Sequence, residues 1–109
     1  EELKKDVILK IKKALEYYSS LGTRVYILCW TPELVDKIKE DSFLNKIFIP
    51  MYYQDREYDC IHDIQVVNKN FRIDMDDTLP CKPIYDEHPS LECHNIIYKS
   101  IVKKLKEDL

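Results

Sequence analysis

The residues whose types and spacing could carry chemistry begin at Asp86, where the chain reads Asp-Glu-His-Pro-Ser. A carboxylate close to a histidine can fix the tautomer of the imidazole and stabilise its protonated form, as a general base requires near neutral pH. Pro89 would stiffen the backbone directly after His88. We therefore take His88 as a candidate base and Asp86 as the acid that orients it. The alternative is a surface histidine near a helix start, paired casually with Asp86 or Glu87.

A second candidate lies in the acidic stretch from Asp74 to Thr78, which fits the pattern Asp-x-Asp-x-Thr. This pattern resembles that of haloacid-dehalogenase-like phosphatases, which implies Asp74 as nucleophile, Asp76 as acid and base, and Mg²⁺ held by the carboxylates. The motif normally opens its domain, whereas here only about thirty residues follow it. The alternative is an acidic turn that caps a strand.

Several side chains have the chemistry of zinc ligands, but their spacings do not form two matched pairs. They are Cys60, His62, Cys81, His88, Cys93 and His94. Buried thiols and scattered histidines are the simpler interpretation. The four cysteines lack a Cys-x-x-Cys pair, which favours a reducing compartment and a cytoplasmic location. Cys29 lies in an apolar run and is expected to be a buried thiol.

The composition of the chain excludes several classes of function. The chain has 109 residues, 45% of them hydrophobic, which suits one α/β domain over residues 1–109 or the excised C-terminal part of a larger domain. The formal charge is -3, and acidic and basic residues are mixed along the chain. This pattern indicates no binding surface for nucleic acid or membrane. Gly22 is the one glycine, so glycine-rich phosphate loops and the dinucleotide fingerprint are excluded. No apolar run reaches the ~18 residues of a membrane span.

The elements that would position these residues follow from hydrophobic periodicity. Residues 3–21 predict a helix, and residues 23–30 predict a strand buried on both faces. A second helix is expected to begin at Thr31 as N-cap with Pro32 in its first turn.

The remaining elements are short until the last one. Residues 47–49, 64–67 and 71–73 are strand candidates, and the aromatic stretch 51–63 is expected to be mainly loop. Pro89 is expected to open a closing helix that reaches about Glu107. The sequence thus predicts an α/β fold with a small, mainly parallel sheet flanked by helices. Such a sheet would leave an open edge, which predicts a further segment or a homo-oligomer.

The stretch "YDEHPSLECHNIIYKSIVKKL" resembles the C-terminal block of SGNH/GDSL-type hydrolases. That block has an Asp, one or two residues, His-Pro, a Ser or Asn, a second His and a closing amphipathic helix. The resemblance implies the C-terminal half of a flavodoxin-like domain. It also implies His88 as catalytic base, Asp86 as its orienting acid and His94 as a structural helix position. The family's Gly-Asp-Ser nucleophile block and its glycine and asparagine blocks are absent from these residues.

Three functions remain open. The resemblance implies the base-bearing part of an ester hydrolase or acyltransferase for an acyl ester such as an O-acetyl sugar. This part would be inactive until a missing N-terminal segment or a partner chain supplies the serine, and it would need no cofactor. The second function is a non-catalytic binding or assembly domain. The third is a Mg²⁺-dependent phosphatase fragment centred on Asp74 and Asp76.

Overall fold

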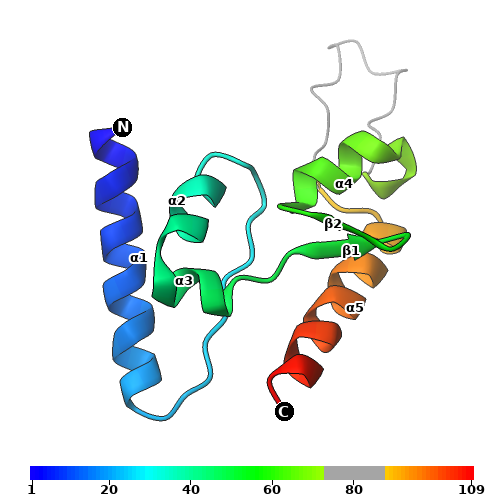
Figure 1. Cartoon of the computed structure of the whole chain (residues 1–109). Helices are drawn as coiled ribbons and strands as arrows, with labels where there is room; N and C mark the ends of the chain where they lie inside the picture. Colours follow the sequence, from blue (N-terminus) through cyan, green and yellow to red (C-terminus); the bar gives the residue numbers. More distant parts are fainter. Residues whose placement is uncertain (73–87) are drawn as a thin grey trace.

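The computed structural model describes residues 1–72 and 88–109 and shows a mixed α/β fold (Figure 1). Within these two ranges the chain forms five α-helices, one 3₁₀ turn and one antiparallel pair of strands. In chain order they are α1 (Glu2–Ser20), α2 (Val35–Glu40), α3 (Ser42–Ile47), β1 (Met51–Tyr53), β2 (Arg56–Tyr58), α4 (Ile61–Val67), η1 (Lys69–Phe71) and α5 (Leu91–Glu107).

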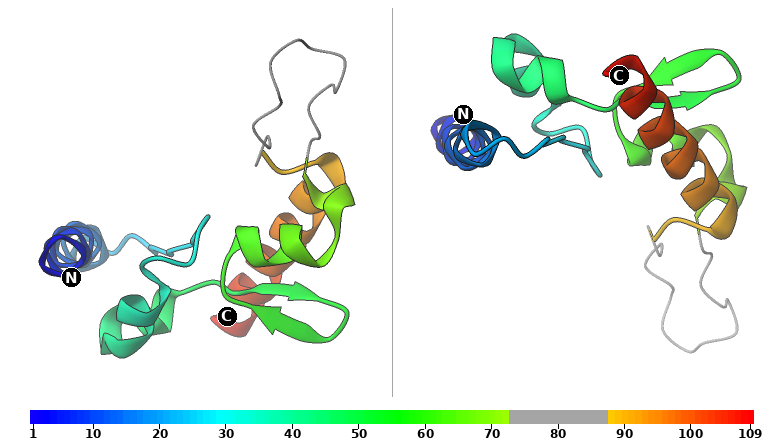
Figure 2. Two further views of the ribbon diagram at one scale, coloured as in Figure 1. Left: turned by 90° about the horizontal axis from the view of Figure 1, so that it is seen from above. Right: turned by 90° about the horizontal axis from the view of Figure 1, so that it is seen from below.

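Residues 24–30, the central segment, run between the two halves of the molecule (Figure 2). The segment meets the end of α3 through a parallel bridge between Ile27 and Phe48, with the Ile27 amide 3.0 Å from the Ile47 carbonyl oxygen. Side chains of an extended chain alternate between two sides. Tyr26 and Leu28 accordingly pack on one cluster, while Ile27 and Cys29 belong to the other.

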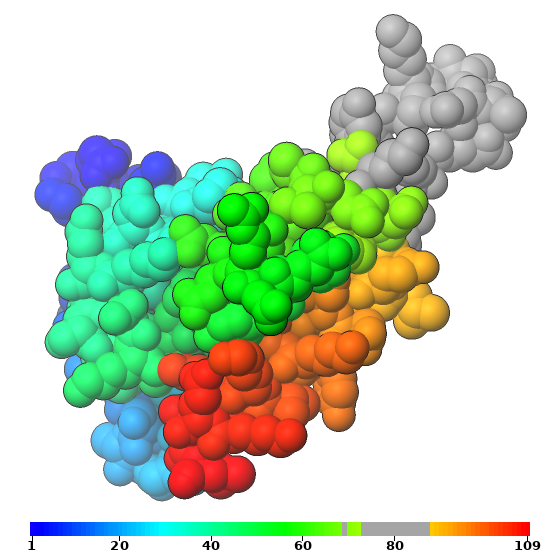
Figure 3. Space-filling view, turned by 45° about the vertical axis from the view of Figure 1, so that its right-hand side comes forward, coloured from blue at the N-terminus to red at the C-terminus, as the bar shows by residue number. Residues whose placement is uncertain are grey.

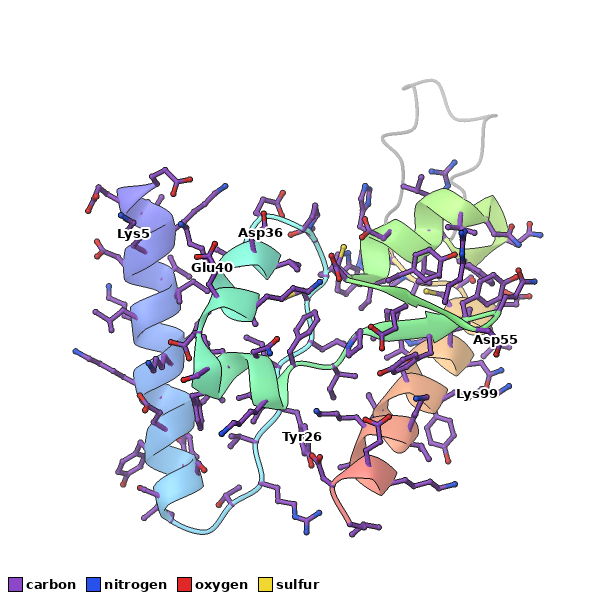
Figure 4. The ribbon with its side chains drawn as sticks, in the orientation of Figure 1. Lys5, Tyr26, Asp36, Glu40, Asp55 and Lys99 are labelled. Carbon is purple, nitrogen blue, oxygen red and sulfur yellow. The ribbon has the colours of Figure 1, made fainter. Side chains whose placement is uncertain are left out.

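The first hydrophobic cluster joins the β1–β2 hairpin to α4 and α5. Its buried members are Ile49, Met51, Ile61, Ile64, Phe71, Cys93 and Ile96. Ser100 of α5 connects this helix to the hairpin, because its hydroxyl accepts from the Tyr52 amide at 2.9 Å. At the far end of α5, the Tyr26 hydroxyl donates to Asp108 at 2.9 Å (Figure 4). The central segment and the closing helix are therefore linked directly.

The second hydrophobic cluster joins α1, α2, α3 and the central segment. Its buried members are Cys29, Val35, Ile38, Leu44, Phe48 and Cys60. Helix α1 contributes only partly buried side chains and has no fully buried residue. Asp41 separates α2 from α3: its carboxylate accepts from the amides of Phe43 and Leu44 and pairs with Lys12 of α1 at 2.8 Å. This residue therefore caps α3 and helps to hold α1 in place.

The predicted parallel sheet and flavodoxin-like arrangement are wrong. In the described ranges the only paired strands are β1 and β2, which are antiparallel, with Met51 opposite Tyr58. The parallel contact of the central segment is limited to the isolated bridge at Ile27. Helices and the hairpin, instead of neighbouring strands, cover its two faces. The apolar run thus identified a central extended segment but not its partners.

Residues 51–67 also differ from the prediction. The expected loop over 51–63 forms the hairpin, whose turn places Gln54 and Asp55 at φ values of 50° and 63°. The expected strand over 64–67 is the end of α4, and Phe71 belongs to η1. Ile61, Ile64 and Gln65 are buried at helical spacing, and this tertiary contact overrides the strand preference of the β-branched residues.

Both long helices are confirmed, with α1 and α5 close to the predicted ranges. The N-cap of α5 is Ser90, two residues after His88, whereas Pro89 was expected to open the helix. Thr31 is not the cap of α2, which begins at Val35 after Leu34. Among the helices of residues 1–72 and 88–109, none is long and apolar enough to cross a membrane.

Candidate functional site around His88

The end of the central segment fixes the start of α4. The Ile61 amide donates to the Cys29 carbonyl oxygen at 3.0 Å, and the His62 amide donates to the Trp30 carbonyl oxygen at 2.9 Å. The first amides of a helix lack partners within the helix. Because the central segment supplies two acceptors, α4 begins directly beside Trp30. His62 is thereby placed at the end of the central segment.

The backbone after His88 is also held firmly. Pro89 forms an antiparallel bridge with Arg72, and the Ser90 amide donates to the Phe71 carbonyl oxygen at 3.1 Å. The Ser90 hydroxyl accepts from the Cys93 amide at 3.3 Å and donates to the Asn70 carbonyl oxygen at 2.6 Å. The Ser90 hydroxyl thus caps α5 and connects this helix to η1. These contacts orient the chain that carries His88.

The His88 side chain lies against Trp30. The two ring centroids are 6.1 Å apart and the ring planes are inclined by 85°, an edge-to-face arrangement. The His88 side chain is exposed, and Trp30 is 42% exposed. The imidazole is thus solvent-exposed and has an aromatic ring beside it. Asp86, the predicted orienting acid, lies outside the described residues.

Glu33 lies three residues after Trp30. The pKa of Glu33 is lowered, first by a hydrogen bond from the Thr31 side chain, then by its own backbone amide, and further by the charges of Lys4 and His62. Glu33 therefore carries a stabilised negative charge. The contact of Trp30 with His88 was not expected from the sequence. The available signal was the position of Trp30 at the end of a buried extended run, where side chains gather in layered folds.

The other predicted sites receive no support in the described ranges. Asp74 and Asp76 of the phosphatase motif lie outside those ranges, as does Cys81. Elsewhere in residues 1–72 and 88–109, no group of three or more His, Cys, Asp or Glu side chains could hold a metal ion. His94 is exposed on the first turn of α5, where its amide donates to the Ser90 carbonyl oxygen at 2.9 Å.

The cysteines behave as buried thiols. Cys29, Cys60 and Cys93 are free and buried, so the predicted burial of Cys29 is confirmed. Burial in apolar surroundings raises the pKa of Cys60 to about 11 and also raises the pKa of the other two thiols. A thiol that stays protonated is a poor nucleophile and a poor metal ligand. These three cysteines therefore act as packing residues.

No family model, curated protein or solved structure matches this chain.

Proposed function

We propose that this chain is the base-bearing part of an SGNH-type ester hydrolase or acyltransferase. In this proposal His88 is the general base and Asp86 orients it. A further segment of a longer protein, or a partner chain, supplies the serine nucleophile and the oxyanion donors. The substrate is an acyl ester, with an O-acetyl sugar as the favoured example.

One observation carries the proposal: the exposed His88 ring lies beside Trp30 on a backbone that is fixed directly afterwards. Pro89 and Ser90 are both tied to the η1 region, so the imidazole projects from an anchored position. A general base must be reachable by substrate and yet held in place. The contact with Trp30 meets the second requirement, and the exposure of His88 meets the first.

The proposed reaction has two steps. His88 accepts the proton of the serine hydroxyl while the serine oxygen attacks the ester carbonyl carbon, and the alcohol leaves with that proton. Water, or a second alcohol in the acyltransferase case, then attacks the acyl-serine carbonyl carbon while His88 takes its proton. The bond from that carbon to the serine oxygen breaks, His88 returns the proton to the serine oxygen, and the carboxylic acid or the new ester is released. The carboxylate keeps the imidazole in the tautomer that can accept. Backbone or side-chain N–H groups of the serine-bearing part would stabilise the oxyanion.

The test uses the protein in which this chain and a Gly-Asp-Ser segment occur together. Turnover of p-nitrophenyl acetate should fall by about 10²–10⁴-fold in His88→Ala, since this is the usual contribution of a positioned base. His94→Ala is the matched control, because His94 is an exposed histidine on the first turn of α5, six residues after His88, and its turnover should be unchanged. Equal turnover in wild type and His88→Ala refutes the proposal. The proposal is also refuted if neither the full protein that contains this chain nor any partner protein has a Gly-Asp-Ser segment.

A second candidate, a non-catalytic assembly domain, is favoured by a different observation. An apolar groove of about 560 Å³ lies between α1 and the central segment, with Leu15, Ile27 and Leu34 among its lining residues. Helix α1, on one side of this groove, has no fully buried residue. Apolar surface of this kind is typical of protein contacts. Sedimentation velocity tests the idea: self-association over micromolar concentrations supports it, and a monomer at every concentration contradicts assembly through copies of the chain.

A further inference from the structure

A second groove, separate from the Trp30–His88 contact, lies between the hairpin, η1 and the first turns of α5. Its volume is about 450 Å³. In the space-filling view the hairpin surface adjoins α5 on this side of the molecule (Figure 3). Asp55 at the hairpin tip and Lys99 of α5 are labelled near it in Figure 4. We call this hollow the hairpin groove.

Four carboxamide side chains from three elements line the hairpin groove. They are Gln54, Asn68, Asn70 and Asn95. The Asn68 side-chain oxygen accepts from the Asn70 amide at 2.9 Å, so its NH₂ group remains available. Among the described residues, the side-chain amides of Gln54, Asn70 and Asn95 have no hydrogen-bond partner. The groove therefore contains several uncommitted groups that can each donate and accept.

The groove also has an apolar and aromatic side. Phe71 and Ile96 are 5% and 8% exposed, and the Tyr53 ring meets Phe71 edge-on with centroids 5.1 Å apart. The ring of Tyr52 is already covered by the Lys103 ammonium at 4.2 Å. The half-buried Tyr53 is thus the aromatic ring left to meet a ligand, and it packs against the buried Phe71. An aromatic surface beside a few polar groups is the usual composition of a small-molecule site.

The charges in the groove balance. Glu92 and Lys99, both on α5, are its charged lining residues, and neither forms an ion pair within residues 1–72 and 88–109. One carboxylate and one ammonium give no net attraction for a charged ligand. Both can still hydrogen-bond to hydroxyl groups, since a carboxylate accepts and an ammonium donates. A neutral, hydroxyl-rich ligand matches this set.

The backbone argues against an extended peptide in the same place. A peptide that adds to a strand needs free main-chain groups on the strand edge. The Tyr52 amide, on β1, is already bonded to the buried Ser100 hydroxyl at 2.9 Å. The Tyr52 amide is therefore not available to pair with an added strand.

We propose that the hairpin groove binds a neutral saccharide, with the carboxamides bonding to its hydroxyl groups and the aromatic side meeting its C–H face. The proposal is independent of ester chemistry, because the groove residues do not include His88. Saccharide binding in the groove would therefore persist even if the hydrolase proposal were refuted.

The experiment titrates the ¹⁵N-labelled chain with cellotriose and follows the side-chain NH₂ signals of asparagine and glutamine. Saturable shifts of the Asn70 and Asn95 signals support the proposal. The double variant Asn70→Ala with Asn95→Ala should bind about tenfold more weakly, as expected from the loss of two modest hydrogen bonds. Asn45→Ala is the matched control, because Asn45 is an exposed asparagine on α3 that does not line the groove.

Three outcomes overturn the proposal. One is the absence of any saturable shift with cellotriose. Another is a response to triglycine at the groove without a response to cellotriose, which would indicate a peptide site. The third is unchanged affinity in the double variant while its spectrum remains that of a folded chain.

Discussion

Ser100 offers the most quantitative test of how the closing helix and the hairpin are joined. Its side chain is 0% exposed, and its hydroxyl makes two hydrogen bonds. It donates to the Ile96 carbonyl oxygen at 2.8 Å within α5 and accepts from the Tyr52 amide of β1 at 2.9 Å. Replacing Ser100 by alanine removes the acceptor for a main-chain amide in a half-buried position.

The expected loss of stability follows from that amide. Leaving an N–H group without a partner away from water costs about 1–3 kcal/mol. The Ile96 carbonyl keeps its place in the helical hydrogen-bond ladder, so it adds little to the loss. We therefore expect Ser100→Ala to lower the free energy of unfolding by about 2 kcal/mol. For a domain of this length, that corresponds to a fall in Tm of roughly 8–16 °C.

Urea unfolding followed by far-UV circular dichroism measures this change. Ser20→Ala is the control, because the Ser20 hydroxyl also donates to a carbonyl oxygen of its own helix, that of Tyr17, but at an exposed end. The control should lie within about 0.5 kcal/mol of wild type. Hydrogen exchange at the Tyr52 amide should become faster in Ser100→Ala only. A loss below about 0.5 kcal/mol, or an unchanged Tyr52 exchange rate, would refute this reasoning.

Three further predictions concern charge, reactivity and backbone conformation. Lys12 and two backbone amides lower the pKa of Asp41, so its contribution to stability is present above its ordinary value of 3.8 and is lost as the pH falls through its lower folded value. In Asp41→Asn, which keeps the helix cap, acid unfolding curves should therefore show a smaller loss of stability in that range. With a pKa of about 11, Cys60 is thiolate in only about one molecule in a thousand at about pH 8. Mass spectrometry should accordingly show iodoacetamide labelling of the native chain at Cys60 no faster than unfolding allows, and fast native labelling contradicts its burial. Asp55→Gly should stabilise the hairpin by up to about 1 kcal/mol in urea unfolding, because glycine adopts a φ of 63° without the ~1–2 kcal/mol cost of a left-handed L-residue, which exceeds its own entropic cost of about 0.5–1 kcal/mol. A destabilised variant would contradict the left-handed turn.

The two long helices could be predicted because their periodicity is unambiguous. In α5 the stripe of Cys93 and Ile96 recurs at helical spacing, and both side chains are buried. The central segment was also recognisable, since its apolar side chains alternate between two clusters. Its neighbours could not be predicted, because an apolar run records burial and not the identity of what covers it.

The hairpin and α4 were missed for physical reasons. The turn at Gln54 and Asp55 holds two positive φ values without glycine, so the usual hairpin signal is absent. Helix α4 is seven residues long, and its β-branched residues favour a strand. Its start is determined by carbonyl groups of Cys29 and Trp30, about thirty residues earlier. A local pattern cannot encode such a contact.

The candidate site shows the same division. His88 could be singled out from its neighbours in the sequence, since a nearby carboxylate and a following proline are local features. Trp30 meets it through the path of the central segment, and the end of that segment is also bonded to the start of α4. These are long-range consequences of folding. They emerge only when the ends of several elements are brought to one place.

The most direct test of the central claim is the rate at which a fluorophosphonate probe labels the serine of the protein that contains this chain. Such a probe reacts with a serine that a neighbouring base has activated. We predict rapid labelling in wild type and in His94→Ala, and labelling slowed by about 10²-fold or more in His88→Ala. Equal labelling rates in wild type and His88→Ala would contradict the assignment of His88 as the base.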